Sequence, residues 1–246
     1  MSQARARGGR LSAFNEKFIV EVREAPASTK RALYRWAAVL AGVGLTGFIT
    51  LLVVVVRDGE VTGIDRPFLA WLAGNHSDTL TPVMAWLALI FGPVMLPIVA
   101  LVVVSAWGFF AKHLWRPLLL AIGLVAGLLA VQVVTRLVGR ERPPPDQMLL
   151  GLDTTASFPS GHVAGAADFM LLIAYLVFSR RAKPRTTVVS FAVAVILIGV
   201  SAVSRIYLGY HWPSDAIASI FLSFAVLGGI IALDTHRTVR TKDEKL

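Results

Sequence analysis

The sequence predicts an all-α polytopic membrane protein in which six transmembrane helices form one bundle. Of its 246 residues, 56% are hydrophobic and only 16% are charged, with a mean hydropathy of +0.69, whereas a soluble domain carries about 25% charged residues. A membrane helix needs about 20 consecutive apolar residues, and the chain holds six such runs. They lie near Tyr34–Val56, Leu87–Phe110, Pro117–Leu137, Gly161–Phe178, Thr187–Val203 and Ser214–Asp234. Residues 34–234 are therefore expected to form one domain with short loops, between basic tails at 1–33 and 235–246.

Two of the spans have distinctive flanks. The second is interrupted by Gly92, Pro93 and Pro97 and preceded by Pro82, and because proline bends a helix and removes a backbone donor, its start is predicted to be broken or tilted. The first follows a basic tail without a small-residue cleavage site, so it is predicted to be a retained anchor. Within that tail, residues 12–24 have near-helical apolar spacing, which fits either a short helix on the inner leaflet or a plain solvated tail.

The distribution of basic residues predicts the orientation of the chain. Eighteen of the 24 Lys and Arg residues lie in the two tails and in the loops after the second and fourth spans. Basic residues favour the cytoplasmic side of a cell membrane, so both termini are expected inside and the loops after spans one, three and five outside. The net charge of +9 then reflects topology and anionic lipid, and nucleic acid is not an expected partner. The Ala-, Val- and Arg-rich composition is typical of a high-GC bacterium.

Three segments at span ends gather arginines and two histidines on the predicted outer face. They are Arg136–Pro145, Ser157–His162 and Ser204–Asp215. The planar guanidinium group of arginine matches the oxygens of a phosphate. The free N–H groups of a helix that begins near Ser160 also favour an anion. The three segments therefore predict a cradle for a phosphate or another oxyanion.

The two histidines suggest a division of labour beside this cradle. One imidazole can attack phosphorus while the other protonates the leaving oxygen. His211 and Asp215 are four residues apart at the start of the sixth span. A carboxylate there can hold one nitrogen of the ring and leave the other free to attack. The chain has no cysteine, which excludes a disulfide, a thiolate metal site and a cysteine nucleophile.

These segments resemble the three signature motifs of the type 2 phosphatidic acid phosphatase superfamily, membrane lipid phosphatases whose active site is shared with vanadium haloperoxidases. The family pattern is Lys-x6-Arg-Pro, then Pro-Ser-Gly-His, then Ser-Arg-x5-His-x3-Asp. The second motif matches Pro159–His162, and the third matches at Ser204, Arg205, His211 and Asp215. The first matches at Arg142-Pro143, but Thr135 stands at the lysine position. Its neighbour Arg136 is therefore the candidate for the missing cation.

The resemblance implies a role for each matched residue. His211 would form a phosphohistidine, Asp215 would orient it, and His162 would protonate the leaving lipid oxygen and then activate water. Arg142, Arg205, Ser160 and the N–H group of Gly161 would hold the oxygens of the transition state, with Arg136 as a further candidate. The family needs no cofactor and no metal.

The resemblance also implies a lipid phosphate monoester or diphosphate as substrate. Phosphatidic acid and phosphatidylglycerol phosphate both fit, and a polyprenyl diphosphate is favoured because an outward-facing site suits the recycling of a carrier lipid. That preference is an analogy at the level of the fold. Two other functions fit the same residues: transfer of a phosphoryl group or headgroup to a lipid acceptor, and transport of a lipid or anion without cleavage.

Several polar residues outside the motifs carry separate expectations. Arg140 is expected either to anchor a lipid headgroup or to bind substrate. Asp168 lies inside the fourth span, about 120° around the helix from His162, and is expected to be a buried partner of an arginine or a hydroxyl group. The hypothesis drawn from it is that Asp168 supports a catalytic arginine through the bundle. The remaining histidines are expected to have no catalytic role; they are His76, His113 and His236.

Overall fold

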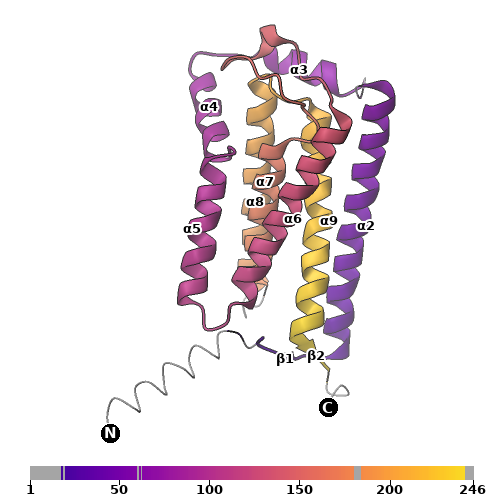
Figure 1. Ribbon diagram of the computed structural model, residues 1–246, viewed down its shortest axis with the longest axis vertical. Helices are drawn as coiled ribbons and strands as arrows, with labels where there is room; N and C mark the ends of the chain where they lie inside the picture. The colour runs from indigo at the N-terminus through magenta and orange to yellow at the C-terminus, as the bar shows by residue number, and fades with distance from the viewer. Residues whose placement is uncertain (1–17, 19, 60, 62, 180–183, 242–246) are drawn as a thin grey trace, which may run out of the picture.

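The computed structural model describes residues 18, 20–59, 61, 63–179 and 184–241, and Figure 1 shows long, nearly parallel helices packed into one bundle. The helices are α2 (Ala27–Asp58), α3 (Asp65–Ala73), α4 (Leu80–Ile90), α5 (Met95–Phe110), α6 (Trp115–Val138), α7 (Gly161–Ile173), α8 (Pro184–Tyr207) and α9 (Pro213–Thr238). A short 3₁₀ turn, η1 (Pro145–Gln147), precedes α7, and a π-helical turn, η2 (Ala174–Phe178), extends it. Among the described residues, five helices are long and apolar enough to cross a membrane, and the pair α4 and α5, counted as one span, makes six. The predicted all-α bundle is therefore confirmed.

The second span is a bent pair of helices and begins earlier than predicted. It starts at Leu80, whereas the sequence indicated Leu87, and α4 and α5 meet at an angle of 45°. Gly92 and Pro93 lie in the break between them, as the interrupted pattern predicted. The break comes close to the start of α7, because a Cβ atom added to Gly92 would lie 3.6 Å from Nε2 of His162. The bend thus brings the backbone of the second span beside a candidate catalytic residue.

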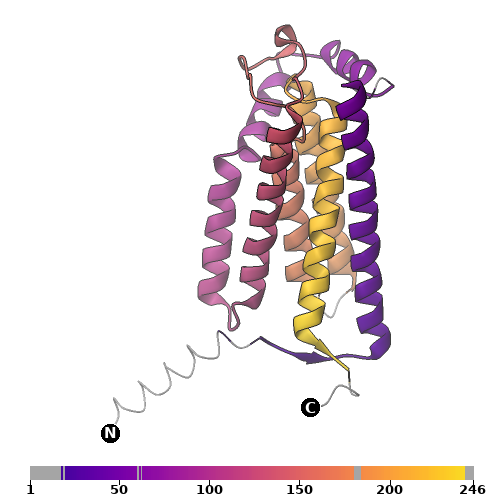
Figure 2. The same ribbon diagram turned by 45° about the vertical axis from the view of Figure 1, so that its right-hand side comes forward.

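Helix α3 is an element that the sequence did not predict. The segment after the first span was expected to be a short loop, but it forms a nine-residue helix that lies across the end of the bundle (Figures 1 and 2). Leu69 and Leu72 on this helix are buried, whereas Phe68 and Trp71 are exposed. A helix this short cannot cross a bilayer, so the search for long apolar runs passes over it.

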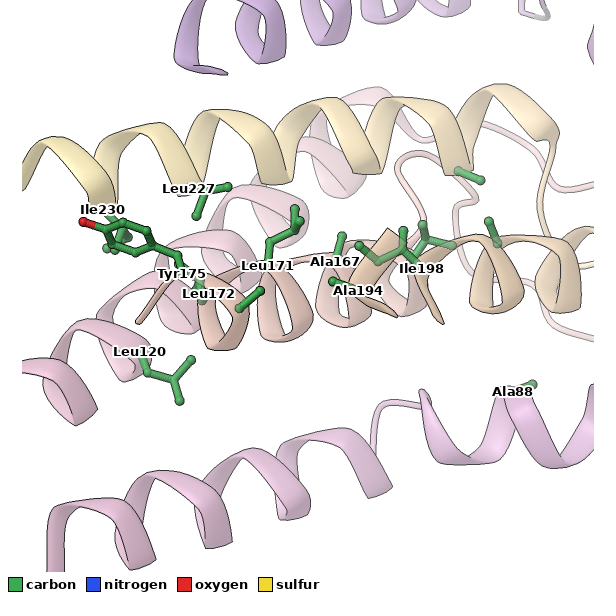
Figure 3. Close-up of a cluster of buried hydrophobic side chains, with 14 of the residues drawn as sticks. Ala88, Leu120, Ala167, Leu171, Leu172, Tyr175, Ala194, Ile198, Leu227 and Ile230 are labelled. Atoms are coloured by element: carbon green, nitrogen blue, oxygen red, sulfur yellow. The ribbon is translucent and has the colours of Figure 1, made fainter. Parts of the chain in front are cut away.

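The core lies where α7 and α9 meet the helices around them. Figure 3 shows Leu171 and Leu172 of α7 among side chains from α8 and α9, and both are buried. Helix α2 packs along α9 through small residues: a Cβ atom on Gly44 would lie 2.5 Å from the backbone nitrogen of Ala225. Small residues at such positions allow two helix backbones to approach closely.

The two ends of the described chain meet at one end of the bundle. The two-residue strands β1 (Arg23–Glu24) and β2 (Val239–Arg240) pair in parallel there. We name this the terminal end, and we name the opposite end, which carries α3, the site end (Figure 1). Most of the predicted surface helix at residues 12–24 lies outside the described residues, and its last two residues form β1 instead of a helix.

Candidate active site

The structure brings the matched motif residues together at the site end of the bundle. They come from the loop after α6, the start of α7, the last turn of α8, the turn between α8 and α9, and the first turn of α9. In that order they are Arg142, Ser160 to His162, Arg205, His211 and Asp215. Backbone hydrogen bonds join these segments: the N–H group of Ser157 donates to the carbonyl oxygen of Arg140 at 2.8 Å. That of Ser160 donates to the carbonyl oxygen of Asp215 at 3.5 Å.

The ring of His211 is buried and held by its Nδ1 nitrogen. Nδ1–H donates to the backbone carbonyl oxygen of Ser157 at 2.8 Å, and Oδ2 of Asp215 lies 3.4 Å from the same nitrogen. The orienting contact predicted for Asp215 is thus shared with a nearer carbonyl group that the motif does not name. Nε2, on the other side of the ring, lies 3.4 Å from Nη1 of Arg142. A neutral imidazole held in this way has its Nε2 lone pair available for attack.

The surroundings of His211 keep its imidazole neutral. Burial lowers its pKa well below the ordinary value of 6.5, because it disfavours the charged ring. The positive charges of Arg205 and Arg142 lower the pKa further, while the carbonyl oxygen of Ser157 and the carboxylate of Asp153 act in the opposite direction. A neutral ring at pH 7 is the form that a nucleophilic histidine requires.

Arg142 is held in place by the loop before α7. Its Nε and Nη2 donate to the backbone carbonyl oxygen and the hydroxyl oxygen of Thr155, each at 2.8 Å. Its Nη1 donates to the carbonyl oxygen of Tyr210 at 2.5 Å. Asp153 completes the set through an ion pair of 2.9 Å. Burial lowers the pKa of Arg142, and the nearby carboxylate of Asp153 opposes that shift.

Asp153 is a residue of the site that the motifs did not indicate. Burial acts to raise its pKa, but hydrogen bonds from Thr155 and the charge of Arg142 outweigh it and hold the pKa below its ordinary value. Its carboxylate is therefore ionised at neutral pH and lies within electrostatic reach of both Arg205 and His211. It is an anion already present beside the predicted phosphate cradle.

Two donors in this cluster are buried without a partner among the described residues. They are Nε of Arg205 and the hydroxyl group of Ser160, and both side chains are buried. The guanidinium carbon of Arg205 lies 4.5 Å from the centre of the Tyr210 ring, which supports one face of the group. A buried donor without an acceptor costs about 1–3 kcal/mol. The oxygens of a bound anion would satisfy both groups.

The start of α7 supplies the second histidine. His162 lies in the first turn of this helix, after Gly161, and within electrostatic reach of His211, Arg205 and Arg142. The first N–H groups of a helix have no intrahelical acceptor. At Gly161 the nearest atom to an added Cβ belongs to Val131, at 3.8 Å. The two histidines, two arginines and the free helix end thus form one cluster.

Arg140 has neither of the roles predicted for it. It is buried, and its Nη2 donates to Oδ2 of Asp65 at 2.7 Å. Its Nη1 donates to Oδ1 of Asp215 at 2.5 Å and to the hydroxyl oxygen of Ser214 at 2.8 Å, while Nε donates to the carbonyl oxygen of Gly59 at 2.9 Å. A guanidinium group engaged on all three nitrogens by the protein itself is neither a headgroup anchor nor a substrate-binding group. Its distant partner Asp65 gave no signal in the sequence.

Two other expectations also change. Arg136 is exposed on the last turn of α6, and its side chain makes no contact with the cluster among the contacts of the described residues. Asp168 is buried close to the hydroxyl group of Ser223, with its Oδ2 only 1.8 Å from where a Cβ of Gly127 would lie. The expected hydroxyl partner is therefore found. The neighbours of its carboxyl group among the described residues are Gly127 of α6 and Ser223 of α9, and it forms no ion pair with an arginine there, which contradicts the hypothesis that Asp168 supports a catalytic arginine.

A surface pocket of about 820 Å³ opens beside the cluster at the site end. Its apolar lining comes from the ends of α2 and α6, with Val55, Val56 and Leu137, and from α3, with Leu69 and Ala70. Arg142 and Trp212 also line it. Of the histidines outside the motifs, His76 bonds through Nε2 to the backbone carbonyl oxygen of Tyr207 at 2.9 Å. Among the residues that the structure describes, no group of three or more His, Cys, Asp or Glu side chains could hold a metal ion.

Comparisons with known proteins agree with this arrangement. The chain is 30% identical over 133 residues to phosphatidylglycerophosphatase B of Bacillus subtilis (strain 168), an alignment that covers 52% of this chain and 62% of that protein, or less than two thirds of its length. It is also 30% identical over 163 residues to an Escherichia coli (strain K12) protein named as a candidate undecaprenyl-diphosphatase, YbjG, covering 64% of this chain and 72% of the other.

A solved structure shares the fold. It is the crystal structure of a transmembrane PAP2-type phosphatidylglycerolphosphate phosphatase from Bacillus subtilis, which matches 78% of this chain and 96% of its own with a TM-score of 0.69 and 21% sequence identity. The chain is accordingly a multi-pass membrane protein. The model of the PAP2 superfamily matches residues 114–238. This range includes all three motifs and the motif side chains that the structure brings together, namely Arg142, Ser160, His162, Arg205, His211 and Asp215. The chain therefore belongs to the PAP2 superfamily.

Proposed function

We propose that this protein is an integral membrane lipid phosphatase that hydrolyses a lipid phosphate monoester or diphosphate through a phosphohistidine. The observation that carries the proposal is the pairing of a buried, neutral His211 with two buried donors, Arg205 Nε and the Ser160 hydroxyl group, that have no acceptor among the described residues. Buried donors are otherwise almost always satisfied. A phosphoryl group beside Nε2 of His211 would supply the missing acceptor oxygens.

The first step transfers the phosphoryl group to the enzyme. Nε2 of His211 attacks phosphorus with its lone pair, the bond from phosphorus to the leaving oxygen breaks, and His162 donates a proton to that oxygen. Ser157 and Asp215, which face Nδ1–H, stabilise the positive charge that develops on the ring. The transition-state oxygens accept hydrogen bonds from Arg142, Arg205, Ser160 and the N–H group of Gly161.

The second step returns the enzyme to its starting state. His162, now neutral, takes a proton from water as the water oxygen attacks phosphorus, and the phosphorus–nitrogen bond breaks to release phosphate and neutral His211. No cofactor or metal takes part in this scheme. The Asp153 carboxylate that pairs with Arg142 competes with the incoming phosphate for the same guanidinium group.

The proposed site faces the extracytoplasmic side of the membrane. The described parts of both tails, which include Arg23 and Arg240, and the loop between α5 and α6, which includes Lys112, lie toward the terminal end. Basic residues favour the cytoplasm. The lipid chain of the substrate would then lie along the bundle in the outer leaflet, while its phosphate enters the cluster. The apolar wall of the pocket, at Val55, Val56 and Leu137, suits such a chain.

A polyprenyl diphosphate is our favoured substrate, with phosphatidylglycerol phosphate and phosphatidic acid as alternatives. The name of the Escherichia coli relative supports the first, and that of the Bacillus subtilis relative supports the second. Because an outward-facing phosphatase meets lipids released outside the cytoplasm, a carrier lipid fits the proposed orientation.

The test is phosphate release by the purified full-length chain from each of these three lipids, with EDTA present. We expect release from at least one lipid by the wild type and by His236→Ala, a matched control at an exposed histidine of the terminal end, and none from His211→Ala. Release that occurs only when a second lipid accepts the phosphoryl group would favour a transferase. Binding of all three lipids without any release would favour a transporter and overturn the proposal.

A further inference from the structure

The buried carboxylate of Asp65 is the starting point. Asp65 lies at the start of α3, outside the PAP2 motifs, and its side chain is fully buried. Its Oδ2 accepts hydrogen bonds from Arg140 Nη2 and from the Ser214 hydroxyl group, each at 2.7 Å, and from the N–H group of Val61 at 2.9 Å. Its Oδ1 accepts from the N–H group of Ser214 at 2.9 Å. Burying a charge is costly unless it is paired and hydrogen-bonded, so a carboxylate with four donors is a built feature of the site end.

Arg140 connects this carboxylate to the candidate active site. Asp65 holds Nη2 of its guanidinium group and the carbonyl oxygen of Gly59 holds Nε, which leaves Nη1 directed at Oδ1 of Asp215. The other oxygen of Asp215, Oδ2, is then free to accept from the N–H group of Trp212 at 2.9 Å and to face Nδ1 of His211 at 3.4 Å. Because the guanidinium group of Arg140 is planar and rigid, its bond to Oδ1 of Asp215 leaves Oδ2 as the oxygen that faces His211.

The charges of this chain of contacts have a consequence for the reaction. Asp65, Arg140 and Asp215 together carry one net negative charge when all are ionised, because two carboxylates share one guanidinium group. His211 gains positive charge as it attacks phosphorus. A preorganised negative charge beside it stabilises that change in the transition state more than in the ground state. Without the charge of Asp65, the positive charge of Arg140 would neutralise the negative charge of Asp215, and no net negative charge would remain beside His211.

We propose that Asp65 is a positioning residue that acts on His211 through Arg140 and Asp215. It orients Oδ2 of Asp215 toward the ring and offsets the charge of Arg140. Helix α3, which lies across the site end (Figure 2), thereby contributes to the reaction through a buried carboxylate at its start. This inference rests on the proposed lipid phosphatase activity.

The experiment compares Asp65→Asn with Asp234→Asn. Asp234 is the matched control, because it is also a buried carboxylate near an arginine, Arg116, but it belongs to the terminal end. For Asp65→Asn we expect kcat for the best lipid substrate to fall about 10- to 100-fold, as for loss of a group that supports a catalytic residue, while KM changes less than about threefold. Asp234→Asn should retain the wild-type kcat and KM.

A second variant keeps the proposal testable if Asp65→Asn does not fold. Arg140→Lys keeps one positive charge but cannot bridge two carboxylates in a planar fork, so its kcat should also fall with KM maintained. If the effect passes through Arg140, the double variant should lose no more than the larger single loss. Detergent-solubilised variants are first compared by thermal unfolding, so that kinetic data come only from folded protein.

The outcomes separate this inference from the proposed function. Absence of phosphate release by the wild type would defeat the proposed function itself. A wild type that is active beside Asp65→Asn or Arg140→Lys with unchanged kcat would overturn only the positioning role. An Asp65→Asn variant whose loss lies in KM alone would also overturn it, because that result would assign Asp65 to substrate binding.

Discussion

The two ends of α9 offer the same pair of residue types in different settings. At the site end, Asp215 pairs with Arg140 and faces His211. At the terminal end, Asp234 lies 3.8 Å from Arg116, but its oxygens accept hydrogen bonds from the Trp115 indole at 3.0 Å and the Tyr175 hydroxyl group at 2.9 Å. Tyr175 is labelled beside Ile230 of α9 in Figure 3. Both carboxylates are buried, and each is held by several donors.

The difference between the two ends shows what turns a buried ion pair into a reactive site. At the terminal end two aromatic side chains, Trp115 of α6 and Tyr175 of η2, donate to Asp234 and so connect these elements to α9. At the site end a second carboxylate holds the arginine, and one oxygen of Asp215 is left for a histidine whose other nitrogen faces the arginine cluster. A buried carboxylate is therefore structural by default, and it gains a chemical role when it faces a group that can react.

Replacing the proposed nucleophile, His211, should have the largest effect on activity at the site end. His211→Ala should reduce kcat by about 10⁴-fold or more, because loss of a nucleophile removes a covalent step, while the fold is maintained. Phosphate release by purified protein measures the loss, and the thermal unfolding temperature reports on the fold. Wild-type rates from the variant would show that the site end has no nucleophile at this position.

Weakening the anion cradle should have the next largest effect. Arg205→Lys removes the planar group over Tyr210 and the buried Nε donor, so kcat should fall about 10²- to 10³-fold, as for the loss of one transition-state donor. Single-turnover phosphate release would separate this chemical loss from weaker binding. A variant that changes KM alone would place Arg205 in ground-state binding only.

The dependence of kcat/KM on pH should reveal the charge environment of His211. A bell-shaped profile is expected, since one histidine must be neutral and the other protonated. The pKa of His211 is lowered by burial and by Arg205 and Arg142, so the neutral ring persists to lower pH and the acid limb should lie below about pH 6.5. Arg142→Gln removes one positive charge, raises that pKa and should move the limb to higher pH. A flat profile between about pH 5 and 9 would argue against two catalytic histidines.

Removal of the Asp153 carboxylate, which already pairs with Arg142, should have a smaller effect. Asp153→Asn removes an anion that competes with phosphate for Arg142, so KM should decrease. The pair is partly exposed, and such pairs contribute about 0.2–1 kcal/mol, or about a 1.5- to 5-fold change. Initial rates over a range of lipid concentrations measure it. An increase in KM would instead assign Asp153 to substrate recognition.

The terminal end should respond in stability and not in activity. Asp234→Asn retains the acceptor oxygen but loses the charge beside Arg116, so the free energy of unfolding should fall by about 1–3 kcal/mol. Thermal unfolding in detergent, followed by tryptophan fluorescence, measures this change. A matching loss of kcat in folded protein would mean that the two ends of α9 are not independent.

The sequence could predict those features of the molecule that depend on runs of apolar residues or on the spacing of residues close together in the chain. Apolar runs of membrane length predicted the bundle, and Gly92 with Pro93 predicted the break in the second span. The three motifs predicted which side chains converge. The spacing of His211 and Asp215 predicted their contact, because residues four apart lie on one face of a helix start.

The remaining parts depend on contacts between single residues far apart in the chain. Asp65 and Arg140 are separated by 75 positions, and a lone acid after a membrane span has the same local pattern whether it is solvated or buried. Asp153 lies in a loop, and its local sequence likewise does not indicate that it pairs with Arg142. The sequence indicates Arg136 only because it stands next to Thr135, the position of the missing lysine. The structure leaves Arg136 exposed on the last turn of α6 and buries Arg140 in the loop that follows this helix.

The packing of α2 on α9 constrains how the chain is made. The most extensive helix contact of α2 is with α9, which is synthesised after the other helices of the described residues. At typical synthesis rates α2 waits roughly ten to thirty seconds in the bilayer before α9 emerges from the ribosome. During that interval its small-residue face, at Gly44, is open to lipid or to other nascent helices. A ribosome stalled before residue 213 would therefore leave α2 without the helix against which it packs most extensively.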